Sequence, residues 1–206
     1  MARVSAIVLA AGLSSRMQGR QKLFLPYRNN TILEQVVTEL LDSKASEVII
    51  VSSPLTHDQI KAMSFACQPA GKGITLVTNP DHKLGMTTTI QKGVEAASPA
   101  TDGFMICLGD MPRIITMEYD KLLDRFSEKH RENPKSILLP FYQGQKGNPV
   151  IFSSFYREAI LTHTDMEGCR GIVQANSAHL TKVEMQNDHV LVDVDTPGDY
   201  ERLPDL

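Results

Sequence analysis

The residues best suited to chemistry lie close to the start of the chain. An apolar run over residues 4–11 ends at Gly12, and two hydroxyl and two basic side chains follow within the next stretch: Ser14, Ser15, Arg16 and Lys22. Small residues let a ligand approach the backbone, whose N–H groups can face phosphate oxygens beside the hydroxyls and the cations. The stretch predicts an anion-binding loop after a buried strand; the alternative is an ordinary turn with solvated charges.

Two common phosphate-binding motifs do not fit this loop. A P-loop requires a second glycine followed by Lys and Ser or Thr, but Gly12 and Gly19 are too far apart and Gly19 precedes Arg20. The glycine fingerprint of dinucleotide-binding folds is also missing, because Leu13 and Ser14 follow Gly12. Both absences disfavour a P-loop enzyme and a dehydrogenase.

A carboxylate follows a second apolar run. Asp110 comes after residues 104–108 and Gly109, and the glycine permits close approach of a ligand. A carboxylate at the end of a buried strand suits a Mg²⁺ ligand. The competing interpretation is a turn or helix-capping Asp.

Two further carboxylates, Asp193 and Asp195, lie near the end of the chain. If residues 190–194 form a strand, both side chains share one face, and Asp195 at its end is the better candidate for a metal ligand. The alternative is that Asp195 caps the helix begun by Pro197, which Thr196 could do equally well. Two carboxylates beside a loop of Arg and Lys match the needs of Mg²⁺-dependent nucleotide chemistry.

The apolar pattern predicts the elements that would bring these residues together. Strands are expected at residues 4–10, 47–53, 74–78, 104–108, 136–141, 148–152, 181–185 and 190–194. Helices are expected at residues 31–41, 56–66, 85–97, 116–129, 153–161, 171–179 and 197–203. This alternation implies a three-layer α/β/α, Rossmann-like fold with a mainly parallel sheet. Ligands bind such sheets at the carboxyl ends of strands, where Gly12, Asp110 and Asp195 can converge.

Two details complete the expected organisation. Thr31 and Glu34 form a capping box at the start of the first helix. The neighbouring strands within residues 136–152 break the alternation and predict a small antiparallel insertion over the sheet. No repeat or long linker divides the chain, so a single domain over residues 1–206 is expected.

The composition narrows the class of protein. The 206 residues are 42% apolar and 22% charged, which disfavours disorder. A net charge of −3 gives no electrostatic case for nucleic acid or a membrane surface as partner. No apolar run approaches a membrane span, and no room for a signal peptide precedes the first strand. The scattered cysteines lack a paired spacing, which indicates reduced thiols and a cytoplasmic protein.

Four motifs, taken in order, resemble those of the molybdenum-cofactor nucleotidyltransferases, which have a glycosyltransferase-A-like fold. They are Leu-Ala-Ala-Gly-Leu-Ser-Ser-Arg-Met from Leu9, Leu-Gly-Asp-Met-Pro from Leu108, Gly-Asn-Pro-Val from Gly147 and Asp-Val-Asp-Thr-Pro-Gly-Asp from Asp193. Gly-Met-Thr-Thr-Thr, from Gly85, is similar to a stretch near the nucleoside. The resemblance spans nearly the whole chain, and the combination is specific although each motif alone is weak.

The resemblance implies a role for each motif. Nucleotide binding falls to Leu9, Ala10, Ala11, Gly12, Ser14, Ser15, Arg16, Lys22, Gly85, Thr88, Thr89 and Asp110. Among these, Arg16, Lys22 and Asp110 are the implied catalytic residues, and Asp110 with Asp195 would hold Mg²⁺. The implied acceptor side consists of Pro112, Gly147, Asn148, Pro149 and Arg170.

The first motif also bears on the choice of nucleotide. Cytidine-specific members have Leu-Ala-Ala-Gly and GTP-using members Leu-Ala-Gly-Gly, so Ala10 and Ala11 point to CTP by resemblance. Three positions depart from the family pattern. The family commonly has Gly directly after Arg-Met, but here Gln18 stands between Met17 and Gly19. Asn148 stands where the family commonly has His, and Cys169 stands where the family often has the Asp of Gly-Asp-x-Gly.

The sequence therefore predicts a Mg²⁺-dependent transfer of CMP from CTP to the terminal phosphate of a molybdopterin-type acceptor, with release of pyrophosphate. The resemblance also implies a molybdoenzyme or its chaperone as a protein partner. The alternatives are a related enzyme acting on a sugar phosphate or another small phosphorylated acceptor, a GTP-using guanylyltransferase, and a non-catalytic chaperone that binds the nucleotide or cofactor.

Overall fold

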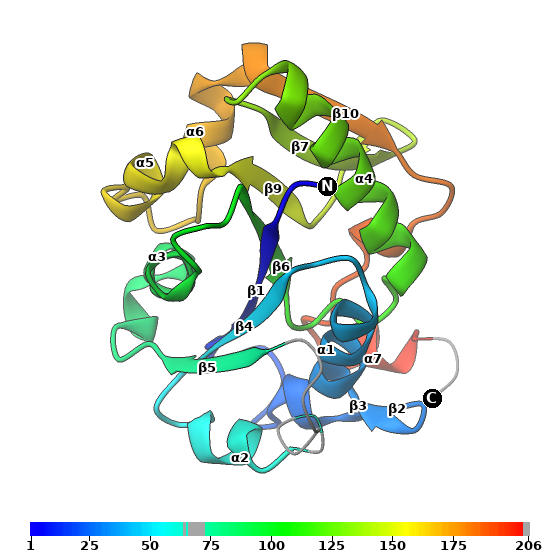
Figure 1. Cartoon of the computed structure of the whole chain (residues 1–206). Coiled ribbons are helices and arrows are strands. Elements are labelled where there is room, and N and C mark those ends of the chain that lie inside the picture. The colour runs from blue at the N-terminus through cyan, green and yellow to red at the C-terminus, as the bar shows by residue number, and fades with distance from the viewer. Residues whose placement is uncertain (64, 66–72, 204–206) are drawn as a thin grey trace.

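A computed structural model describes residues 1–63, 65 and 73–203, and its centre is one large, mostly parallel sheet (Figure 1). The strands are β1 (Val4–Ala10), β4 (Glu47–Ser52), β5 (Ile74–Thr78), β6 (Gly103–Leu108), β7 (Ile137–Tyr142), β8 (Gln145–Lys146), β9 (Val150–Ser153) and β10 (Leu180–Glu184). They follow the order β10-β7-β9-β6-β1-β4-β5, and β8 pairs with β7. β1 lies between β4 and β6, parallel to both.

Helices cover both faces of the sheet (Figure 1). The helices α1 (Ile32–Asp42) and α4 (Thr116–Glu132) pack on one face, and α3 (Met86–Ala96), α5 (Arg157–Leu161) and α6 (Arg170–Ala175) on the other. Because successive strand residues point to opposite faces, Val8 joins the first layer and Ile7 the second. The expected three-layer α/β/α fold is confirmed.

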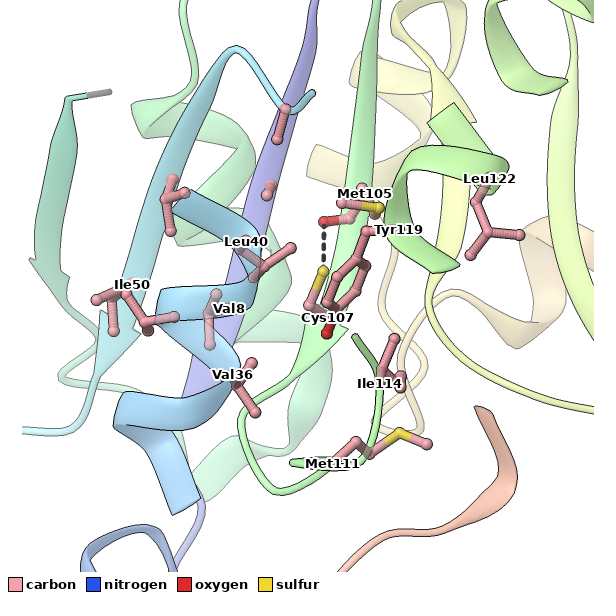
Figure 2. Close-up of a cluster of buried hydrophobic side chains, with 14 of the residues drawn as sticks. Val8, Val36, Leu40, Ile50, Met105, Cys107, Met111, Ile114, Tyr119 and Leu122 are labelled. Atoms are coloured by element: carbon pink, nitrogen blue, oxygen red, sulfur yellow. Dashed lines mark hydrogen bonds between the residues drawn. The ribbon is translucent and has the colours of Figure 1, made fainter. Parts of the chain in front are cut away.

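The layer beneath α1 and α4 shows why β1 is so apolar. Figure 2 shows Val36 and Leu40 of α1, Tyr119 of α4, and Val8 and Ile50 of the sheet as members of one apolar cluster on this face. All five are at most 1% exposed. A strand covered on both faces must be apolar along its whole length.

A smaller apolar cluster holds the site loops. It joins Met17 of the loop after β1, Tyr27 of the hairpin β2 (Pro26–Tyr27) and β3 (Asn30–Thr31), Ile32 at the start of α1, and Val194. The capping box of Thr31 and Glu34 is confirmed and fixes where α1 begins. The loop after β1 is therefore packed against the segment that carries Asp195.

Several expected elements differ from the structure. Residues 190–194 do not form a strand; a 3₁₀ turn (His189–Leu191) leads into an extended segment that does not join the sheet. Its alternating apolar residues fill two places, Val190 against Gly147 and Val194 in the cluster of Met17. The expected antiparallel strands are present within residues 136–152, where β8 pairs antiparallel with β7, and β9 lies in the main sheet, antiparallel to both β7 and β6.

Three of the expected helices are shorter than predicted, whereas α4 continues beyond the expected residue 129 to Glu132. The segment 153–161 splits into a 3₁₀ turn (Ser154–Tyr156) and α5, and 171–179 into α6 and a 3₁₀ turn (Ser177–His179). The helix at 56–66 is α2 (His57–Lys61); residues 64 and 66 lie outside the described part, as does Cys67. No helix of the described residues is long and apolar enough to cross a membrane.

Candidate functional site

A cavity of about 410 Å³, the first cavity, opens at the carboxyl ends of β1 and β6. Most predicted nucleotide and metal residues line it: Leu9, Ala11, Gly12, Ser14, Ser15, Arg16, Lys22, Gly85, Thr89, Asp110 and Asp195. They come from four segments that are distant in the sequence. The structure thus brings the predicted loop, both carboxylates and the Gly85 motif to one place, as the strand-end rule anticipates.

The loop after β1 folds as two consecutive turns. Met17 N donates a hydrogen bond to Ser14 O, and Arg20 N donates one to Met17 O, both at 3.0 Å. Ser14 and Gln18 have φ values of 50° and 53°, in the left-handed region. The additional residue Gln18 is therefore absorbed within a turn, and Lys22 still reaches the cavity.

Lys22 joins the two predicted metal ligands. Its Nζ forms an ion pair with Asp110 Oδ2 and a second, at 2.7 Å, with Asp195 Oδ1. Arg16 Nη2 pairs with Asp195 Oδ2 at 2.7 Å. Between the segments, Val194 N donates a hydrogen bond to Asp110 O at 3.0 Å. Carboxylates remote in sequence therefore share one ammonium group.

The capping interpretation is wrong for both carboxylates. Ile115 is the residue before α4, so Asp110 does not cap that helix. Thr196 Oγ1 accepts a hydrogen bond from Asp199 N at 3.2 Å and caps α7 (Pro197–Glu201). The side chains of Asp110 and Asp195 are thus engaged with Lys22 and Arg16, inside the cavity.

Burial and charge oppose each other at Lys22. Burial lowers the pKa of its ammonium group, but Asp110 and Asp195 raise it through charge and hydrogen bonding, and the pKa lies above its usual 10.5. Asp193 also lines the cavity; burial raises the pKa of its carboxyl above 3.8, and the charges of Asp110 and Asp195 raise it further. Negative charge is therefore concentrated in this cavity, where it would stabilise a bound cation.

Asp110 keeps one oxygen free for a further ligand. Its Oδ1 is buried and has no hydrogen-bond partner among the residues that the structure describes. Within the described residues, no group of three or more His, Cys, Asp or Glu side chains could hold a metal ion. Mg²⁺ is usually held by one or two carboxylates together with water and substrate phosphates. Asp110 and Asp195 fit a site that a nucleotide completes.

The start of α3 forms the opposite wall of the first cavity. Gly85 has φ of 107°, and a Cβ added to it would lie 2.6 Å from the carbonyl oxygen of Met166, so no larger residue fits. Thr89 lines the cavity. Thr88 does not, because its hydroxyl accepts a hydrogen bond from Asn79 Nδ2 at 2.9 Å and donates one to a carbonyl of its own turn.

A loop before α6 is attached to this same helix start. Met86 N donates to Met166 O at 3.0 Å, Thr87 Oγ1 donates to Asp165 O, and Gly168 N donates to Thr87 Oγ1 at 3.1 Å. The loop consequently belongs to the boundary between the first cavity and its neighbour.

The neighbouring second cavity has a volume of about 560 Å³ and shares Met86 and Leu108 with the first. Three predicted acceptor-side residues line it: Gly147, Asn148 and Arg170. A Cβ at Gly147 would lie 2.5 Å from the carbonyl oxygen of Val190, so the glycine allows this wall to close. The two adjoining cavities can hold two substrates side by side.

Four predicted residues line neither cavity: Ala10, Thr88, Pro112 and Pro149. Ala10 is fully buried in the layer beneath α1, and Pro112 and Pro149 are also buried. Sequence reasoning did not select several residues of the first cavity: Leu13, Leu23, His82, Lys83, Met86, Leu108 and Asp193. The position of His82 and Lys83 just before Gly85 was the available signal for those two.

Comparison with known proteins identifies the family. The family model of the MobA-like NTP transferase domain matches residues 6–183, so this chain belongs to that family of nucleotidyltransferases. It is 27% identical over 200 residues to the molybdenum cofactor cytidylyltransferase of Escherichia coli K12, covering 97% of this chain and 95% of that protein. It is 26% identical to the purine catabolism protein PucB of Bacillus subtilis 168, covering 96% and 94%.

A solved structure supports the same fold. Rv0371c from Mycobacterium tuberculosis H37Rv superposes with a TM-score of 0.77 at 22% identity, covering 97% of each chain. A second structure of Rv0371c, in complex with manganese, gives a TM-score of 0.73 at 21% identity. These similarities establish the α/β fold, and the chemistry must be argued from the cavities themselves.

Proposed function

We propose that this nucleotidyltransferase transfers CMP from CTP to the terminal phosphate of a molybdopterin-type acceptor, with Mg²⁺ as cofactor, in the cytoplasm. The observation that carries the proposal is the contact of Lys22 with both Asp110 and Asp195, in a cavity that the Gly12 loop also lines. The choice of acceptor is supported by the similarity to the molybdenum cofactor cytidylyltransferase of Escherichia coli. The choice of CTP is supported by Ala11, which lines the cavity.

In the proposed reaction, a phosphate oxygen of the acceptor attacks the α-phosphorus of CTP. A new P–O bond forms, and pyrophosphate leaves with the electron pair of the broken bond. Since the second pKa of a phosphate monoester is about 6, the nucleophile is ionised near neutral pH and needs no general base. Arg16 and Lys22 hold the leaving pyrophosphate, and the raised pKa of Lys22 keeps it charged. Catalysis then consists of positioning and charge stabilisation.

Asp110 and Asp195 are the residues that would hold the metal ion. The unpartnered Oδ1 of Asp110 and the surplus of carboxylates fit a cation here. A metal ion held there would supply positive charge to stabilise the negative charge that develops on the transferred phosphoryl group. Manganese bound to Rv0371c is consistent with a divalent ion in this fold.

The first test is release of pyrophosphate from CTP and Mg²⁺ in the presence of molybdopterin. We expect release to require both substrates and to be faster with CTP than with GTP or ATP. A preference for GTP would overturn the base assignment, and release only with a sugar phosphate would overturn the acceptor. Nucleotide binding without any pyrophosphate release would indicate a binding protein and contradict enzymatic transfer.

Ala11 provides a sharper test of base selection. Ala11→Gly should relax the preference for CTP over GTP, because it changes Leu-Ala-Ala-Gly to the Leu-Ala-Gly-Gly that the resemblance associates with GTP-using members. The measurement is the ratio of kcat/KM for the two nucleotides. Ala100→Gly, in an exposed loop away from both cavities, is the control. An unchanged ratio in Ala11→Gly would mean that the base is read elsewhere, for example beside Thr89.

A further inference from the structure

The second cavity combines an apolar floor with a charged rim. The floor is formed by Ile90, Ile106, Leu139, Phe141, Val150 and Phe152. Two cations lie at the rim: Lys146 at the end of β8 and Arg170 at the start of α6. Such a lining suits a ligand that places a ring face on apolar side chains and carries a localised negative charge.

The protein provides little negative charge to neutralise these two cations. Lys146 Nζ has no hydrogen bond or ion pair with any residue that the structure describes. Burial lowers the pKa of Lys146, and the charge of Arg170 lowers it further. Arg170 pairs only loosely with Glu167, at 3.4 Å, and both of these side chains are at least 67% exposed. Two cations that repel each other at an apolar cavity favour an added anion.

The backbone around Lys146 is held in place. Phe141 of β7 pairs with Lys146 of β8, and Gly147 N donates a hydrogen bond to Pro140 O at 2.9 Å. Asn148 N donates to Val190 O at 2.9 Å. The ammonium group is therefore carried by a fixed hairpin, although its side chain is exposed.

The location relative to Asp110 is also informative. Strands β7 and β6 are separated by β9, so their carboxyl ends lie two strand spacings, or about 10 Å, apart. Lys146 extends from the hairpin of β7, whereas Asp110 follows β6. A ring system between the two would place one end at the nucleotide and the other at the cationic rim.

We propose that Lys146 and Arg170 form an anion clamp that binds a negatively charged group of the acceptor while the apolar floor binds its ring system. The inference rests on the proposed function, because it assigns the second cavity to the acceptor. It narrows the acceptor to molecules that carry phosphate or carboxylate and have a ring system whose face can pack against apolar side chains. Glu167 would release Arg170 when the anion binds. The anionic group is either the attacking phosphate or a second group of the same molecule.

Binding of simple probes tests the clamp without turnover. The probes are 1-naphthyl phosphate, neutral 1-naphthol and inorganic phosphate, with affinities measured by titration calorimetry. We expect 1-naphthyl phosphate to bind more tightly than either fragment. Lys146→Gln should weaken 1-naphthyl phosphate about tenfold, as expected for a charge-assisted contact at an exposed rim, and leave 1-naphthol unchanged. Lys146→Arg should restore most of the affinity.

Two matched variants assign the probe to a cavity. Lys22→Gln removes a cation from the first cavity and should leave 1-naphthyl phosphate binding unchanged, and so should Lys92→Gln, on the exposed part of α3. Loss of binding in Lys22→Gln but not in Lys146→Gln would place the probe in the first cavity and overturn the clamp. Equal affinity of Lys146→Gln and the unaltered protein would overturn it as well.

Turnover separates the two sources of the anion. With an active acceptor, an increase of its KM at unchanged kcat in Lys146→Gln would show that the clamp holds a group remote from the reaction, and a fall in kcat would show that it holds the attacking phosphate. Unchanged acceptor kinetics would contradict both. Because the probe titrations need no CTP, they remain decisive even if pyrophosphate release fails and the proposed function falls.

Discussion

The two adjoining cavities differ in how their charged side chains are paired. In the first, the cations Lys22 and Arg16 are paired with Asp195, and Lys22 also with Asp110. In the second, Lys146 has no partner among the described side chains, and the walls are mostly apolar. The first cavity is thus organised before any ligand arrives, and the second gains its charge balance from the ligand. Substitutions should therefore act differently in the two places.

The largest effect is expected for Asp110→Asn. Loss of this carboxylate should lower kcat by roughly three decades or more if it holds the metal ion that stabilises phosphoryl charge. The fold should persist, because Asp110 lies at a strand end and not within a layer of the core. Steady-state pyrophosphate release and circular dichroism measure the two quantities. Binding of 1-naphthyl phosphate should be unchanged, which keeps the defect within the first cavity.

A double variant sharpens this prediction. Asp110→Asn combined with Asp195→Asn should be little worse than the more severe single variant, as expected for residues that act as one unit. Independent, multiplicative losses would show that the two carboxylates serve separate roles and would contradict a shared metal ion.

Lys22→Ala should have the next largest effect. Because a charge-assisted contact contributes about 1.5–3 kcal/mol, we expect kcat/KM for CTP to fall by roughly one to three decades. It also leaves Asp110 and Asp195 without their shared cation, so the melting temperature should fall. Added Mg²⁺ should recover part of that stability, which calorimetric melting can measure. Full activity in Lys22→Ala would place the loop away from the phosphates. Lys146→Gln provides the contrast because it should leave CTP binding unchanged.

The smallest effect concerns Asp193 and stability. Its carboxyl pKa is raised in the folded protein, so the folded state binds this proton more tightly than the unfolded chain. The stability contributed by protonation is present below pH 3.8 and is lost as the pH rises through the folded-state pKa. Asp193→Asn should therefore raise the melting temperature slightly at pH 7 and lose that advantage near pH 4.

The Asp110→Asn background is the control for this titration. The charge of Asp110 contributes to the raised pKa of Asp193, so the gain from Asp193→Asn should shrink when Asp110 is already neutral. An equal gain at pH 4 and pH 7 would contradict the electrostatic explanation.

Local patterns of the sequence were sufficient for much of the fold and for the first cavity. The apolar run of β1, the glycine loop and Asp110 follow one another in sequence, and the strand-end rule needs only those facts. Asp195 was placed correctly at the cavity for a wrong reason, because its segment is not a strand. Alternation of apolar residues cannot distinguish a paired strand from an extended segment that packs into two separate clusters.

The second cavity was harder to predict because its residues owe their position to tertiary packing. Lys146 lies in the two-residue strand β8 and Arg170 at the start of a short helix, and neither belongs to an apolar pattern that would reveal its neighbour. Thr88 shows the converse difficulty. Its residue type suits a phosphate, but Asn79 engages its hydroxyl, and no local signal announces that contact.

The loop that joins α5 to α6 ties the two cavities together mechanically. Its hydrogen bonds to Met86 and Thr87 hold the start of α3, which lines the first cavity, while Gly168 lines the second. A ligand that immobilises one side of this loop immobilises the other at the same time. Thermodynamic linkage makes any such cooperativity mutual. If bound nucleotide changes the affinity for the acceptor by a given factor, bound acceptor changes the affinity for the nucleotide by the same factor.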